Sequence, residues 1–103
     1  MKIRKVVISE ETIADLDSGK LFYDSREMGV GDYFIDCLIS DLESLKYFSE
    51  IHAIQYGYFR MFSKRFPFAI YYETTDSEVI VVAILDMRRD PTWLKEQLTI
   101  RKG

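Results

Sequence analysis

Basic side chains gather in two short stretches of an otherwise acidic chain. Arg60, Lys64 and Arg65 form the first stretch, and Arg88 and Arg89 form the second. Guanidinium and ammonium groups bind phosphates and carboxylates, and they stabilise the charge that develops during phosphoryl transfer. The sequence holds 17 Asp and Glu residues against 14 Lys and Arg residues. A local basic cluster on an acidic chain therefore indicates a directed binding surface rather than general polyanion binding.

The first basic stretch is interleaved with aromatic residues, which leaves two interpretations open. Aromatic rings beside basic side chains can stack bases while the cations hold phosphates. Alternatively, the rings form the core face of a strand and the charges form its solvent face. We favour the core interpretation for the phenylalanines of this stretch, which are Phe59, Phe62, Phe66 and Phe68.

Arg88 and Arg89 lie at the exit of an apolar strand and are the sharpest candidate site. Side chains alternate along a strand, so the two guanidinium groups point in different directions. One of them is expected to pair with a nearby acid, Asp86 or Asp90, and the other is then free for a partner. A purely local ion-pair network at the strand exit is the alternative.

Motifs of the common enzyme classes are absent from the sequence. It contains no glycine-rich phosphate loop, no metal-binding spacing of Cys and His, and no G-x-S-x-G. His52 is the only histidine, and we expect it in a loop with a local hydrogen bond rather than at a metal. Cys37 is the only cysteine, and its amphipathic setting predicts a buried thiol. We therefore expect no cofactor and no metal.

The N-terminal half has the pattern of a strand followed by two helices. Residues 2–9 are rich in β-branched side chains, which predicts the strand. Ser9 suits the cap of the next helix, and Gly19 predicts a kink or break inside it. The run 28–31 contains two glycines and ends this helix, and Asp32 is the expected cap of the following one. The second helix has an apolar stripe that predicts its buried face: Phe34, Ile35, Leu38, Ile39, Leu42, Leu45 and Phe48.

The C-terminal half has the pattern of a strand-rich unit with a terminal helix. Residues 49–57 are expected to form a connector. Pro67 cannot donate to a strand ladder and marks a strand start, an edge or a bulge, and Pro91 fits the first turn of a short helix. The nearly continuous apolar run at 79–85 predicts a central, buried strand. Three strands are therefore expected, at 58–62, 66–74 and 79–85.

These elements predict a single α+β domain over residues 1–103 with the order β-α-α-β-β-β-α. The expected fold is a small, mostly antiparallel twisted sheet with an N-terminal αα-hairpin packed on one face. A groove between hairpin and sheet can accept a segment of another chain, with Tyr56, Tyr58 and Trp93 as exposed anchors. The helix acids are expected to form a solvated face: Asp15, Asp17, Asp24, Glu27, Asp36, Asp41 and Glu43.

The apolar segments of the chain are short. No stretch reaches the roughly 20 apolar residues that a membrane span needs. The basic N-terminus is followed by too short an apolar run for a signal peptide. These patterns indicate a cytoplasmic protein that does not enter a membrane.

The whole chain resembles the RelE/ParE superfamily, the toxin halves of bacterial type II toxin–antitoxin pairs. The element order matches. So do the strand motif Arg65-Phe66-Pro67-Phe68-Ala69-Ile70-Tyr71-Tyr72 and the ending Arg88-Arg89-Asp90-Pro91. The resemblance covers about residues 2–98, and it is more specific for the superfamily than for one activity.

The resemblance implies two alternative activities and a protein partner. Some members of the superfamily cleave mRNA on the ribosome, whereas ParE-like members inhibit DNA gyrase without being nucleases. In both groups a small antitoxin wraps the toxin and neutralises it. A third interpretation is a non-toxic member that acts as a binding module. The modest core of a chain of this size is also compatible with a homo-oligomer.

Departures from the nuclease pattern favour the ParE-like branch. The nuclease members carry an arginine in the strand where this chain has Ala69, and a Tyr or His near the C-terminus where it has Trp93. If the chain is a nuclease, Arg88 or Arg89 is expected to stabilise the transition-state charge, with assistance from Lys64. If it is a binding toxin, the surface for target and antitoxin is expected to comprise Arg60, Lys64, Arg65, Arg88, Arg89 and Trp93.

Overall fold

The computed structural model of the protein describes residues 2–102. Its elements follow in the order β1 (Lys5–Ile8), α1 (Glu10–Arg26), α2 (Val30–Ser44), β2 (Ile54–Gln55), β3 (Tyr58–Phe62), β4 (Phe68–Thr74), β5 (Glu78–Asp86) and α3 (Pro91–Lys102). The predicted order is confirmed, with the short strand β2 added inside the expected connector. The first strand is shorter than predicted, and β4 starts directly after Pro67.

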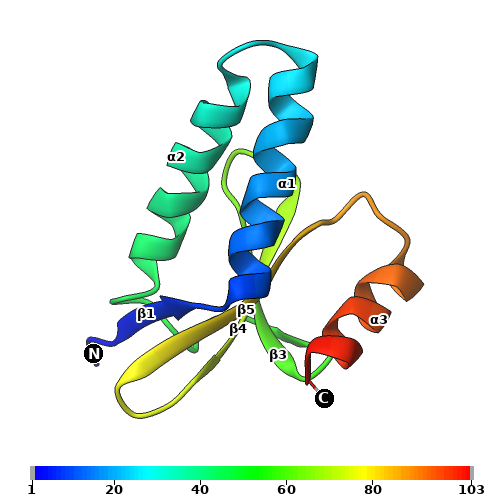
Figure 1. The fold of residues 1–103 in the computed structure, drawn as a ribbon. Coiled ribbons are helices and arrows are strands. Elements are labelled where there is room, and N and C mark those ends of the chain that lie inside the picture. Colours follow the sequence, from blue (N-terminus) through cyan, green and yellow to red (C-terminus); the bar gives the residue numbers. More distant parts are fainter. Residues whose placement is uncertain (1, 103) are drawn as a thin grey trace.

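The strands form one five-stranded sheet in the order β1-β5-β4-β3-β2. β1 pairs with β5 in parallel, and the other neighbours pair antiparallel, which confirms the mostly antiparallel sheet. As predicted, β5 is central, because it lies between β1 and β4 and its Val79, Val81 and Ala83 have no exposed surface. In Figure 1 the α1–α2 hairpin extends well beyond the sheet. The helix α3 lies apart from this hairpin, on the other side of β5.

Helices cover both faces of the sheet, so residues 2–102 form two apolar clusters. The predicted hairpin packs on one face, and α3 packs on the other. The hairpin cluster includes Leu16, Phe34, Leu38, Leu42, Leu45, Met61, Phe68, Ile70, Tyr72, Val79, Val81 and Ile84. The α3 cluster comprises Tyr58, Ala69, Tyr71, Ala83, Leu85, Leu94 and Leu98. Tyr58 was expected as an exposed anchor, but it is buried in this second cluster because β3 turns it towards α3.

A β-bulge at Val82 changes the direction of the side chains along β5. Tyr71 pairs with Ala83 and Tyr72 pairs with Val81, so Val82 is one extra residue in this strand. Before the bulge the odd-numbered residues of β5 face the hairpin, whereas after it Ala83 and Leu85 face α3. A bulge of this kind leaves its extra backbone groups out of the ladder. Those groups therefore need partners from the helices.

The expected break in α1 is absent. Ser9 caps α1 as predicted, with its hydroxyl accepting the Thr12 N–H at 3.1 Å. The helix runs unbroken through Gly19, where a Cβ atom would come within 2.5 Å of the Phe34 ring. The glycine thus allows α1 and α2 to approach each other closely.

α2 begins at Val30 rather than after Asp32. Its cap is Gly29, whose φ of 91° lies in the left-handed region that glycine adopts without strain. The Asp24 carboxylate accepts the Gly31 N–H at 2.8 Å, so a side chain of α1 supplies the capping oxygen. The sequence pattern could not show this because the cap comes from the preceding helix.

Several expected burial states are wrong at the edges of α2. Ile39 is 47% exposed and Phe48 is 49% exposed, although the apolar stripe predicted both as buried. Cys37 is half-buried rather than buried. Conversely, Asp41 was expected on a solvated face but is only 3% exposed, and it accepts a hydrogen bond from the Ser63 hydroxyl at 2.6 Å.

No helix within residues 2–102 combines the length and apolar character needed to cross a bilayer.

Candidate functional site

A groove of about 320 Å³ lies between α1 and α3, beside the second half of β5. Small and aromatic residues of α1 form one wall, and residues of α3 form the other. Its lining comprises Asp15, Ser18, Gly19, Phe22, Phe68, Ile84, Leu85, Asp86, Arg89, Trp93, Gln97 and Arg101. The strand exit singled out from the sequence therefore lies at this groove.

Arg88 is held against the body of the protein. Its guanidinium Nη2 lies 2.7 Å from the Asp86 carboxylate, and its backbone N–H donates to the same carboxylate at 2.9 Å. Burial opposes ionisation of Asp86, but these hydrogen bonds from Arg88 outweigh it and lower the pKa of the carboxyl. The Tyr23 hydroxyl of α1 lies 3.4 Å from the same guanidinium nitrogen. Arg88 thus joins the strand exit to the hairpin.

Arg89 is stacked on Trp93 at the mouth of the groove. The guanidinium carbon lies 3.8 Å from the centre of the Trp93 ring. Within residues 2–102 no carboxylate lies within ion-pair distance of Arg89. Stacking on an aromatic face leaves the N–H edge of a guanidinium free to bind a carboxylate or a phosphate. The prediction that one of the two arginines pairs locally while the other stays free is confirmed.

The remaining predicted cations lie elsewhere. Lys64 and Arg65 lie in the β3–β4 loop and line a second hollow against α2, together with Asp36, Cys37, Ser40 and Asp41. Arg60 lies on β3, where its guanidinium stacks on Phe62 at 4.7 Å and its buried Nε has no hydrogen-bond partner. The five cations that fall in two short stretches of the sequence therefore occupy three separate places in the structure.

The phenylalanines of the basic stretch divide between core and surface. Phe68 is buried, and Phe59 and Phe66 pack against the hairpin cluster, as the core interpretation predicted. Phe62 is 56% exposed and carries Arg60 on its face, so it does not follow that interpretation.

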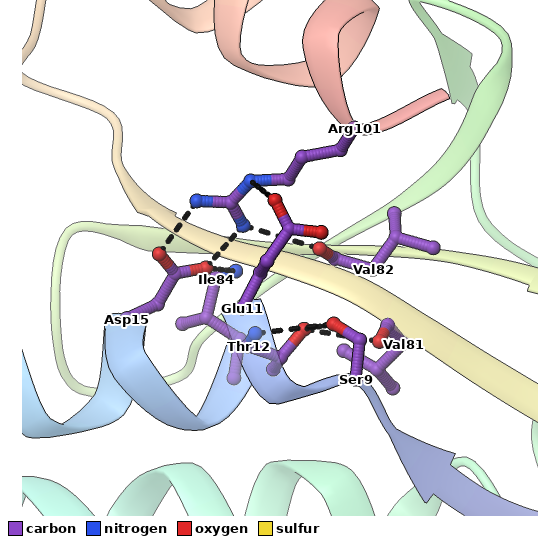
Figure 2. Close-up of polar contacts among 8 residues, drawn as sticks. All are labelled: Ser9, Glu11, Thr12, Asp15, Val81, Val82, Ile84 and Arg101. Carbon is purple, nitrogen blue, oxygen red and sulfur yellow. Dashed lines mark hydrogen bonds and ion pairs between the residues drawn. The ribbon is translucent and has the colours of Figure 1, made fainter. Parts of the chain in front are cut away.

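Polar side chains of α1 and α3 satisfy the outward backbone groups of β5 around the bulge (Figure 2). Thr12 donates its hydroxyl hydrogen to the Val81 carbonyl at 3.0 Å. Asp15 accepts the Ile84 N–H at 2.9 Å, and Arg101 donates to the Val82 carbonyl at 3.1 Å. Asp15 was expected on a solvated face, yet the bulge draws it into a largely buried ion pair with Arg101. This network forms one end of the groove.

Across the described residues, no three His, Cys, Asp or Glu side chains come together as a metal ion would need. His52, expected in a loop with a local hydrogen bond, has its Nδ1 bonded to the Tyr72 hydroxyl, which confirms that expectation. Burial lowers the pKa of this imidazole. It lies on the hairpin face near β2, away from the groove residues.

Comparisons with known proteins support the fold. No protein-family model matches the chain, and no curated protein matches it either. A chain of the chromosomal ParDE TA system from P. aeruginosa has a similar structure, with a TM-score of 0.71. The two share one fold. The match covers 80% of this chain and 94% of the ParDE-system chain at 15% sequence identity. The fold implied by the RelE/ParE resemblance is thereby confirmed.

The groove also contains residues that the sequence did not single out. Phe22 of α1 is 38% exposed and lines the groove. Gln97 and Arg101 lie on the side of α3 that faces α1. The sequence shows Phe22 only as an aromatic residue beside Tyr23, which does not distinguish a groove wall from the core, and nothing in the local pattern indicates Arg101.

Proposed function

We infer that this protein is the toxin of a type II toxin–antitoxin module, ParE-like, cytoplasmic, and neutralised by a cognate antitoxin. Its fold is that of a chain from a ParDE TA system, and this observation carries the proposal. We propose that it acts by binding a protein target such as DNA gyrase. The free Arg89 stacked on Trp93 at the mouth of an apolar groove supports a binding function, because Arg and Trp are frequent hot-spot residues of interfaces.

The positions of Arg88, Arg89 and Lys64 give less support to the alternative, an mRNA endoribonuclease like RelE. Such a reaction needs charge stabilisation and a group that transfers protons at the same place. Arg88 is engaged by Asp86, and Lys64 lies in the separate hollow against α2. Trp93 is the residue beside the free Arg89, and its indole has no acid–base function at neutral pH. Ala69 is completely buried under α3 and supplies no polar group.

Induced expression in a bacterial host tests these alternatives, with growth, DNA supercoiling and transcript integrity followed together. Growth arrest with altered supercoiling and intact mRNA is the expected result. Arrest with cleaved mRNA, lost in Arg88→Ala or Arg89→Ala, would replace the proposal by the nuclease. Cleavage that survives both substitutions would exclude that nuclease mechanism. Normal growth would leave the non-toxic binding module.

Antitoxin binding has its own test, which is co-expression with the small protein encoded beside this gene. We expect the two proteins to co-purify and growth to recover. Failure to co-purify would show that this pairing is wrong. Size-exclusion chromatography with light scattering of the purified chain would show at the same time whether it forms a homo-oligomer.

A further inference from the structure

The outer edge of β1 is an unpaired strand edge. β1 is the first strand in the sheet order and pairs only with β5. The N–H groups of Lys5 and Ser9 donate to carbonyls on the β5 side, at 2.9 Å and 3.2 Å. Alternate residues of a strand point their backbone groups to opposite sides, so the backbone groups of Val6 and Ile8 point outward. Within residues 2–102 no hydrogen bond engages these outward groups.

β1 lacks the features that usually keep a strand edge from pairing. Natural edges are often blunted by a proline, a bulge or a very short strand. β1 contains no proline, and its register against β5 is regular over all 4 residues. The opposite edge of the sheet, β2, is only 2 residues long. Because the Arg4 N–H is already taken by the Lys46 carbonyl at 3.0 Å, the open part of the β1 edge begins after Arg4.

An apolar groove of about 310 Å³ lies beside this edge, between β1 and α2. Its lining comprises Val6, Ile8, Ile39, Leu42, Glu43 and Lys46. Glu43 and Lys46 pair with each other at 2.8 Å, so the apolar side chains are the part of the groove that has no partner. Ile39 is 47% exposed here, at a position where the apolar spacing of α2 predicts burial. An apolar side chain from a second molecule would cover it.

We propose that two copies of this protein pair through β1 in an antiparallel, two-fold arrangement. Val6 of one copy lies opposite Ile8 of the other, and the two such pairs exchange about four backbone hydrogen bonds. The isoleucine of each copy then stands beside Val6 of the other and packs into its groove, against Ile39 and Leu42. The same residues supply both sides of the contact, as a two-fold interface requires.

The charges that flank β1 match this arrangement. In the proposed register Lys5 lies opposite Ser9 of the second copy, one residue before Glu10 at the start of α1. Lys5 and Glu10 are both exposed, and neither forms an ion pair within residues 2–102. A parallel, in-register pairing would instead set Lys5 beside Lys5, which is unfavourable. The dimer uses neither Arg89 nor the groove between α1 and α3, so it is independent of the toxin–antitoxin assignment.

Sedimentation equilibrium of the purified full chain, with no other protein added, tests the pairing. The contact is small for an interface, so we expect a reversible dimer with a Kd of roughly 1–100 µM. Ile39→Arg places a charge in the groove and should raise this Kd by about tenfold or more. Ile54→Arg is the matched control, because Ile54 is an exposed isoleucine on β2 at the opposite edge of the sheet. It should leave the Kd within about twofold.

A cysteine at position 7 tests the register. The backbone groups of Val7 point towards β5, so Val7 faces Val7 of the second copy as a non-hydrogen-bonded pair. The Cα atoms of such a pair are about 4.5 Å apart, which a disulfide can span. Cys37 is the only cysteine, so Val7→Cys is made together with Cys37→Ser and oxidised with glutathione disulfide. We expect a cross-linked dimer, whereas Lys5→Cys in the same background should stay uncross-linked because its two copies lie about 13 Å apart.

Each alternative result contradicts a stated part of the proposal. A chain that remains monomeric at about 1 mM overturns the pairing. A dimer that Ile54→Arg weakens as much as Ile39→Arg, or more, overturns the location. Melting temperatures show whether these variants fold, and the cysteine variants decide the matter if Ile39→Arg does not. A dimer in which Val7→Cys cross-links no better than Lys5→Cys overturns the antiparallel β1 register. Because these measurements use this chain alone, their failure leaves the proposed toxin function untouched.

Discussion

Asp15 and Arg101 join the first helix to the last across the end of the sheet. Arg101 Nη1 lies 2.6 Å from one Asp15 oxygen, and Nη2 lies 2.8 Å from the other, so the pair is bidentate. The hydrogen bonds that Arg101 donates to Asp15 raise the pKa of the guanidinium. Both side chains are about nine-tenths buried. Because Asp15 is on α1 and Arg101 is on α3, this pair sets the separation of the two groove walls.

Removing one member of this pair should destabilise the fold strongly. Asp15→Ala leaves Arg101 without its bidentate partner and leaves the Ile84 N–H unbonded. We expect the free energy of unfolding to fall by about 2–4 kcal/mol in urea titrations. Asp17→Ala, at an exposed position two residues further along α1, should change the free energy of unfolding by no more than about 0.5 kcal/mol. Equal losses in the two variants would mean that the pair contributes nothing beyond helix propensity.

Gly19→Ala should destabilise the protein although alanine favours helices. The gain in helix propensity is about 1 kcal/mol. The added Cβ would lie 2.5 Å from two atoms of the Phe34 ring, which is fully buried between α1, α2 and the sheet. Overpacking of this kind costs about 1–3 kcal/mol, so we expect a net loss in thermal and urea unfolding. Ser18→Ala, at the exposed neighbouring position, should be neutral or slightly stabilising. A stabilised Gly19→Ala variant would show that the two helices can move apart freely.

His52 should make stability depend on pH near neutrality. The Tyr72 hydroxyl accepts the Glu50 N–H at 3.0 Å and also bonds to His52 Nδ1, which accepts the hydroxyl hydrogen when the neutral imidazole carries its proton on Nε2. Protonation of the imidazole would remove that acceptor, and burial lowers the pKa of His52 in the folded state. The unfolded chain then takes up the proton first, and stability falls as the pH drops from about 6.5 through the lower folded-state pKa.

The measurement is the free energy of unfolding of wild type and His52→Gln between about pH 8 and about pH 5.5. Above the ordinary histidine pKa the difference between the two proteins should be constant, and it should shrink as the solution becomes more acidic. Parallel curves throughout this range would show that His52 titrates alike in both states.

Arg89→Ala should reduce function without unfolding the protein. The side chain is exposed and contacts Trp93, so we expect a shift in tryptophan emission and little change in melting temperature. Target and antitoxin binding should weaken by about tenfold, which is typical of an interface arginine. Lys95→Ala removes an exposed cation of α3 outside the groove lining and serves as the control. Equal toxicity of both variants would remove Arg89 from the functional surface.

Local sequence patterns determined most of the secondary structure of this protein. The Ser9 cap, the apolar run of β5 and the start of α3 at Pro91 follow from the preferences of a few neighbouring residues. The pairing of one arginine at the strand exit was also predictable, because Asp86 is close to Arg88 in the chain. Both arginines lie in the turn after β5, so the expected strand alternation is not what separates them.

The tertiary structure alone decided where the functional side chains meet. Asp15 and Arg101 are 86 residues apart in the sequence. Their contact depends on a bulge at Val82 that no local sequence pattern predicts. The same packing separated Lys64 from Arg89, although the sequence groups them. Gly19 was expected to break α1. Instead it lies against the Phe34 ring of α2, where a Cβ atom would clash. Such outcomes depend on long-range packing and on the satisfaction of buried backbone groups, and neither is encoded in the spacing of neighbouring residues.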